Sequence, residues 1–84
     1  MSTSEEIAGA LQQVGAGVGQ CLAAATAAKG KAEQAIQQSV ALGNRDAIAQ
    51  YTAIKNAIEE LIATLTGSRE KTAQVLARAR AALG

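Results

Sequence analysis

Apolar residues recur every three or four positions along most of the chain, which is the spacing of one face of an α-helix. In the first half this stripe runs through Ile7, Leu11, Val14, Val18, Leu22, Ala25, Ala32, Ile36 and Val40, with Lys29 filling one of its positions. The mean step is about 3.67 residues, an eleven-residue period that keeps such a stripe nearly straight. The pattern predicts one long helix with a single apolar face.

The start of this helix has a local signal. Thr3 is a suitable N-cap residue, and Glu6 three positions later completes a capping box. Glu5 and Glu6 also place negative charge in the first turn, where the helix dipole favours it. The sequence therefore predicts a helix over residues 4–42.

The one strong interruption lies at residues 42–46, Leu-Gly-Asn-Arg-Asp. Gly43 can adopt the left-handed conformation that ends many helices, and Asn44 is a good N-cap for a following helix. We therefore predict a turn at Gly43 and Asn44 and a second helix over residues 45–83. Because the connection is so short, the two helices are expected to be antiparallel neighbours.

The second helix repeats the spacing of the first. Its apolar stripe contains Ile48, Tyr51, Ile54, Ile58, Leu61, Ile62, Leu65, Thr72, Leu76, Ala79 and Leu83. Gly67 and Ser68 interrupt this stretch, but Leu65, Thr72 and Ala79 continue a spacing of seven across them. A new helix after a real turn would have no reason to keep that phase, so we expect one continuous helix.

The composition supports an all-α fold. Alanine occupies 21 of the 84 positions, proline is absent, and Tyr51 is the only aromatic residue, so helix formers are abundant and sheet formers scarce. The prediction is a single domain over residues 1–84, an antiparallel two-helix hairpin. Gly15, Gly19 and Ala23 follow one another at a spacing of four, which predicts a smooth strip for close helix packing.

A two-helix hairpin has no interior, so part of a broad apolar face stays in contact with water. We expect this face of the second helix to be a partner interface, which would be buried if two hairpins packed into a four-helix bundle. Its residues are Ile54, Ile58, Leu61, Ile62 and Leu65. The expected partner is a second copy of the chain or a related helical hairpin.

Candidate chemistry is scarce. The chain has no histidine and a net charge of +1, which favours neither general acid–base catalysis nor nucleic-acid binding. Glu59 and Glu60 are adjacent, so they project about 100° apart on a helix and cannot converge. We therefore expect no enzyme activity, cofactor, metal site or small-molecule substrate. Cys21 is interpreted as a small buried residue, with an intermolecular disulfide as the alternative.

The N-terminal residues are acidic where a signal peptide requires positive charge, and the weakly polar run over residues 14–28 is short for a membrane span. The expectation is synthesis in the cytoplasm and no membrane span. Export without a cleaved signal peptide remains an alternative.

Two helices of about 40 residues joined by a glycine-containing turn, and rich in alanine and glutamine, resemble the WXG-type helical hairpins of type VII secretion. That family carries Trp-x-Gly in its turn, of which residues 41–43, Ala-Leu-Gly, keep the glycine. Its secretion tail has a tyrosine followed four residues later by an acidic residue, whereas Tyr51 is followed by Lys55. The resemblance implies a dimeric hairpin that acts as a secreted partner or adaptor.

Two functions follow as hypotheses. The first is a non-catalytic interaction protein that works as a homo- or heterodimer. The second is a structural subunit of a homo-oligomeric filament or scaffold. A fixed dimer in solution favours the first hypothesis, and open-ended growth favours the second.

Overall fold

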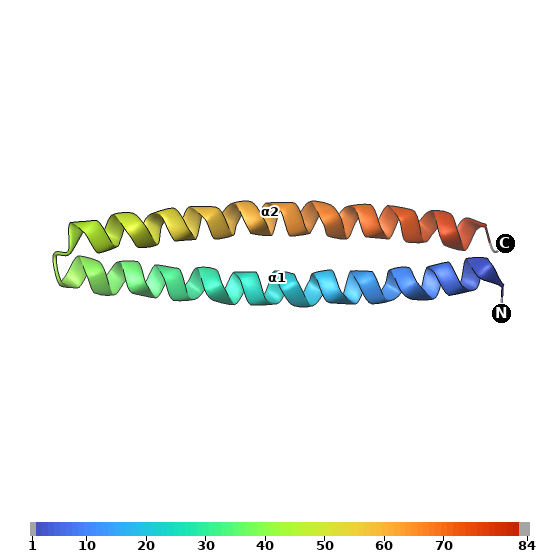
Figure 1. Ribbon diagram of the computed structural model, residues 1–84, viewed down its shortest axis with the longest axis horizontal. Helices are drawn as coiled ribbons and strands as arrows, with labels where there is room; N and C mark the ends of the chain where they lie inside the picture. The colour runs from blue at the N-terminus through green and yellow to red at the C-terminus, as the bar shows by residue number, and fades with distance from the viewer. Residues whose placement is uncertain (1, 83–84) are drawn as a thin grey trace.

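The computed structural model describes residues 2–82 as two long helices, α1 (Thr3–Ala41) and α2 (Arg45–Ala81), which lie antiparallel along their whole lengths (Figure 1). The described residues contain no strand. The hairpin is 62 Å long and 12 to 15 Å across, measured on Cα atoms. The predicted all-α hairpin is confirmed, with both helices ending slightly earlier than expected; residue 83, the predicted end of the second helix, lies outside the described residues.

The first helix begins one residue before the predicted start, because its N-cap is Ser2 and not Thr3. Ser2 has extended backbone angles, and its hydroxyl accepts a hydrogen bond of 3.2 Å from the backbone N–H of Glu5. Glu5 and Glu6 do lie in the first turn. Thr3, the predicted cap, is itself the first helical residue.

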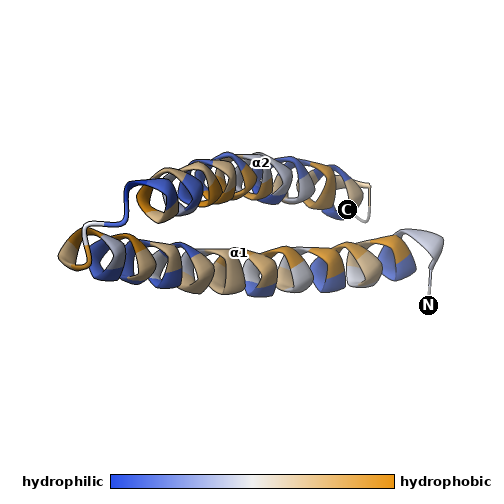
Figure 2. Cartoon of the chain, turned by 60° about the vertical axis from the view of Figure 1, so that its left-hand side comes forward, coloured by the Kyte–Doolittle hydropathy of each residue, from blue (hydrophilic) through white to orange (hydrophobic). Residues whose placement is uncertain are grey.

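The turn is built as the sequence predicted. Gly43 has a φ of +68°, the left-handed region that glycine enters without steric cost. Its N–H donates to the carbonyl of Val40, and the N–H of Asn44 donates to that of Ser39, so the carbonyls at the end of α1 are satisfied. The Asn44 side chain then caps α2 by accepting a 3.1 Å hydrogen bond from Ala47. The connection into α2 is strongly hydrophilic (Figure 2).

The residues of each helix that face the other helix repeat every seven positions, and together they form the seam of the hairpin. In α1 they are Ser4, Ala8, Leu11, Gly15, Val18, Leu22, Ala25, Lys29, Ala32, Ile36 and Ser39, all buried or partly buried. In α2 the partly buried seam residues are Ile48, Lys55, Ile58, Ile62, Leu65, Thr72, Leu76 and Ala79. Because the phase is unbroken from Ile58 to Ala79, α2 passes through Gly67 as one helix, as predicted.

The predicted eleven-residue stripe of α1 is wrong at three places. Ile7, Val14 and Val40 are about half exposed, and Ala8, Gly15 and Ser39 occupy the seam instead. Seam residues that repeat every seven positions have a mean spacing of 3.5 residues, whereas the predicted stripe has a mean spacing of about 3.67 residues. Towards the helix ends the predicted stripe therefore differs from the seam by one residue. Ser39 tolerates burial because its hydroxyl donates a 2.8 Å hydrogen bond to the carbonyl of Ala35.

The core is thin. The buried apolar residues of the described chain are Ala8, Ala25 and Ala32, all in α1, and α2 has no buried residue. Seven large apolar side chains are exposed instead: Ile7, Val14, Val40, Leu42, Tyr51, Ile54 and Leu61. The hairpin therefore covers only one side of each helix.

Candidate interaction surface

The two flanks of the seam differ in chemistry. One series of seam residues in α1 starts at Ser4 and Leu11 and continues every seven positions. The residue directly after each member of this series lies on one flank of the seam. The equivalent residues of α2 lie on the same flank, because equivalent positions of antiparallel helices share a side. This polar flank consists of Glu5, Gln12, Gly19, Thr26, Glu33 and Val40 in α1 and Arg45, Thr52, Glu59, Thr66, Ala73 and Arg80 in α2. In each helix, more than half of these residues carry a charge, a hydroxyl group or an amide group.

Ion pairs cross the hairpin on the polar flank. Lys29 Nζ lies 3.6 Å from Glu59 Oε1, and Lys55 Nζ lies 3.9 Å from Glu33 Oε1. Lys55 also lies 3.9 Å from Glu59, one turn along α2. A spacing of four would pair Lys29 with Glu33 and Lys55 with Glu59 within each helix. Between the described residues the second of these pairs forms, and the other two ion pairs join α1 to α2. The two lysines stand in the seam and direct their ammonium groups outwards to this flank.

The opposite side of the seam is the apolar flank. It consists of Ile7, Val14, Cys21, Ala28, Ala35 and Leu42 in α1 and Ala47, Ile54, Leu61, Ser68, Val75 and Ala82 in α2. None of these twelve residues is charged, and only Ser68 has a hydrogen-bonding side chain of any strength. Ile7, Val14, Ile54 and Leu61 are each 48 to 50% exposed. An uncharged strip with bulky side chains half in water is typical of a surface that another chain covers.

The structure divides the five residues that the sequence predicts as a partner interface. Ile58, Ile62 and Leu65 are partly buried seam residues. Ile54 and Leu61 belong to the apolar flank and remain half exposed. Sequence reasoning missed Ile7 and Val14 as flank residues, because bulky residues were assumed to face the neighbouring helix. Their position one residue ahead of Ala8 and Gly15 is visible only once the seven-residue period of the seam is known.

The predicted strip of small residues does not make the helices approach closely within the hairpin. A Cβ atom added at Gly15 would lie 3.8 Å from Thr72 Cγ2, which is ordinary van der Waals contact. A Cβ atom at Gly19 would meet nothing within 4 Å, and Ala23 is exposed. Only Gly15 of the three stands in the seam.

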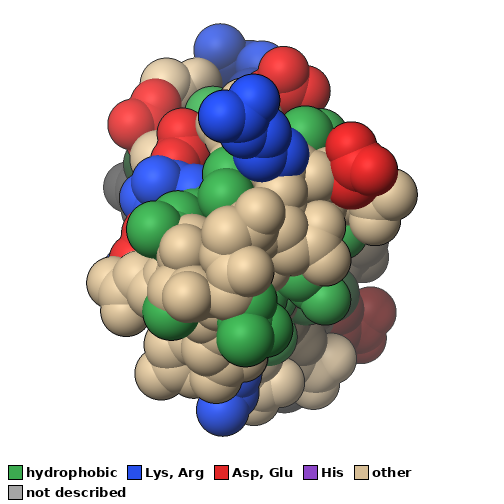
Figure 3. All heavy atoms as spheres, turned by 90° about the vertical axis from the view of Figure 1, so that its left-hand side faces the viewer, with side chains coloured by type: hydrophobic (Ala, Val, Ile, Leu, Met, Phe, Trp, Pro, Cys, Tyr) green, Lys and Arg blue, Asp and Glu red, His purple; other side chains and the backbone are tan. Residues whose placement is uncertain are grey.

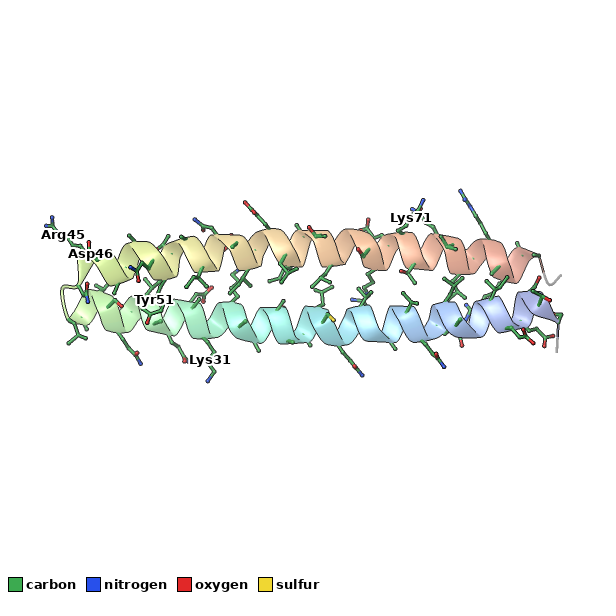
Figure 4. All side chains as sticks on the ribbon, in the orientation of Figure 1. Lys31, Arg45, Asp46, Tyr51 and Lys71 are labelled. Atoms are coloured by element: carbon green, nitrogen blue, oxygen red, sulfur yellow. The ribbon has the colours of Figure 1, made fainter. Side chains whose placement is uncertain are left out.

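Cys21 and Tyr51 are the two remaining residues that stand out in the sequence. Cys21 is exposed on the apolar flank, so its interpretation as a buried residue is wrong. Tyr51 extends from α2 towards α1 near the turn and is 38% exposed (Figure 4). Arg45 and Asp46, at the start of α2, point outwards at the turn end (Figure 4).

The described residues offer little for chemistry. A shallow, open recess on the polar flank is lined by Glu33, Ile36, Gln37 and Lys55, and its carboxylate is paired with the lysine. No three cysteine or carboxylate side chains within residues 2–82 come together as metal ligands.

The turn end shows charged side chains with exposed hydrophobic ones between them (Figure 3). Neither helix, over its described length, contains an apolar stretch sufficient to cross a bilayer.

No protein-family model matches this chain, no curated protein matches its sequence, and no solved structure matches its fold at a significant level.

Proposed function

We propose that this chain is a non-catalytic interaction protein that packs its hairpin against a second helical hairpin, either its own copy or a related chain, in a four-helix bundle. The observation that carries the proposal is the thin seam. Three alanines are the buried apolar residues of residues 2–82, while seven large apolar side chains are exposed. Fully burying one large apolar side chain contributes about 1.5–3 kcal/mol, so a single hairpin leaves part of the stabilisation that these seven side chains can provide unused.

The size of the chain supports the same conclusion. A chain of 84 residues buries a modest fraction of its surface, and proteins of this size commonly gain stability from disulfides, metals or association. A single cysteine cannot form a disulfide within the chain. Association is a source that the exposed apolar residues of the hairpin do offer. In layout the hairpin resembles the WXG-type proteins, and we extend the proposal to their role as exported partner or adaptor.

The test is the concentration dependence of folding, measured by thermal melting with circular dichroism from micromolar to millimolar chain. If a second hairpin completes the fold, the melting temperature rises with the concentration of chain or of added partner hairpin. A fully helical monomer with a cooperative melt at the same temperature throughout would contradict the proposal. Low helicity of the isolated chain at all concentrations would agree with the proposal and would mean that the partner hairpin belongs to a different protein.

A further inference from the structure

We propose that the apolar flank is the interface, and that its occupant is a second copy of this chain. This inference rests on the proposed function and specifies the surface and the partner. The alternative surface, the polar flank, contains the ion pairs of Lys29 and Lys55 with Glu33 and Glu59. Covering that flank would remove these charges from water, a cost that the uncharged apolar flank does not carry.

The dimensions of the flank suit a dimer. The hairpin is 62 Å long and 12 to 15 Å across, so one side has a projected area of roughly 740–930 Å². Stable protein interfaces bury about 800 Å² on each partner. A second hairpin of the same length would cover this strip from end to end, and a shorter peptide helix would leave part of it exposed.

The order of bulky and small residues makes the flank complementary to itself. In α1 the bulky residues Ile7 and Val14 lie at the open end, and Ala28 and Ala35 lie towards the turn. In α2 the order is reversed along the molecule, because bulky Ile54 and Leu61 lie on the turn side. Four of the six levels of the flank therefore pair a bulky residue with a small one, as Ala28 with Leu61, whereas Val14 lies level with Val75 and Cys21 with Ser68.

Both ways of relating two copies by a twofold axis use this order. When the copies lie head to tail, α1 packs on α1 of the second copy, and Ile7 and Val14 meet Ala35 and Ala28. When the turns lie at the same end, α1 packs on α2 of the second copy, and Ala28 and Ala35 meet Leu61 and Ile54. Most bulky side chains meet small ones in either arrangement, which favours close packing between helices. The exception is Val75, which meets Leu61 when the copies lie head to tail and Val14 when the turns lie at the same end.

The neighbouring charges do not oppose such a dimer. Lys31, Lys71 and Arg78 border the apolar flank. The side chains of Lys31 and Lys71 point away from the opposite helix (Figure 4). In both twofold arrangements these lysines lie beside small uncharged residues of the second copy, such as Ala10, Gly17 and Ala57. The net charge of +1 adds no appreciable repulsion between copies.

The experiment compares Leu61→Lys with the matched control Val40→Lys, using sedimentation equilibrium. Both residues are exposed and apolar in the hairpin, at 50% and 59%, but Val40 lies on the polar flank. Leu61→Lys is expected to weaken dimerisation roughly a hundred-fold, because each dimer loses two buried leucines. Val40→Lys is expected to change it less than about three-fold, as a surface substitution does.

A second measurement uses the unaltered chain, in case Leu61→Lys fails to fold. Cys21 is exposed in the single hairpin but lies at the middle of the proposed interface. Its alkylation by a bulky maleimide should therefore slow as the chain concentration rises through the dimerisation range. Association through the polar flank would leave the alkylation rate unchanged, and that result would overturn the proposal.

The remaining outcomes separate this proposal from the proposed function. If the wild-type chain dimerises but only Val40→Lys dissociates it, the surface is wrong and the function stands. If the chain stays monomeric and folds only with a different hairpin, a second copy is the wrong occupant and the function again stands. If the monomeric chain instead binds vesicles of anionic phospholipid, the occupant is a membrane surface and both proposals fail.

Discussion

Replacing the outward-facing glycines by alanine should stabilise the hairpin by a predictable amount. Gly9, Gly30 and Gly67 lie inside helices with ordinary negative φ, and a Cβ atom at each would meet nothing within 4 Å. A helical glycine costs roughly 1 kcal/mol relative to alanine, because it loses more backbone entropy on folding. The three sites are far apart, so their effects should add to about 2–3 kcal/mol in the triple variant.

For a chain of this size, such a gain corresponds to a rise in melting temperature of roughly 10–20 °C. The measurement is thermal or urea unfolding by circular dichroism at one fixed chain concentration. Gly43→Ala is the matched control with the opposite sign, because its φ of +68° costs a side chain about 1 kcal/mol. None of the three glycines stands on the apolar flank, so dimerisation should survive in the triple variant.

A triple variant that melts at or below the wild-type temperature would refute the reasoning. It would mean that another chain approaches the backbone at these glycines, so that the added methyl groups clash with it. Testing the three single variants would then locate that contact. Gly17 is left unsubstituted, because it borders the apolar flank, where a methyl group would face the proposed second copy.

Three further outcomes are expected. Asn44→Ala should lower the free energy of unfolding by about 1 kcal/mol in urea titrations, because the Asn44 side chain caps α2 by accepting a hydrogen bond from the N–H of Ala47. An unchanged urea midpoint would show that this cap is dispensable. Lys55→Met should change stability by less than about 1 kcal/mol, because its two ion pairs are partly exposed, and the small difference should shrink at high salt. Ile62→Asp should remove most helicity at micromolar chain, because it places a carboxylate in the seam; a helical Ile62→Asp variant would contradict the assigned seam.

The turn and the number of helices could be predicted because their signals are local. Gly43 and Asn44 act through their own backbone angles and hydrogen bonds, so no distant residue decides the outcome. The continuity of α2 through Gly67 was likewise predictable from the seven-residue spacing of Leu65, Thr72 and Ala79. The exact cap at Ser2 was not, since three consecutive residues there can each cap a helix.

The face of α1 that meets α2 could not be read from residue size. Ile7 and Val14 are larger than Ala8 and Gly15, yet the smaller pair stands in the seam. The phase is decided by the whole length of both helices together, and one residue of shift exchanges seam for flank. The ion pair between Lys29 and Glu59 also depends on this register, because the two residues are thirty positions apart in the chain.

The position of Lys29 and Lys55 in the seam has a consequence for the size of the assembly. Their ammonium groups reach out on one side only, where Glu33 and Glu59 hold them. Two hairpins that each have one interface surface bind through the same surface on both copies, and no interface surface is then left free. A filament needs a second surface on each copy, complementary to the first. With the interface that we propose, the two lysines therefore limit growth, and the expected end point is a closed particle of two chains.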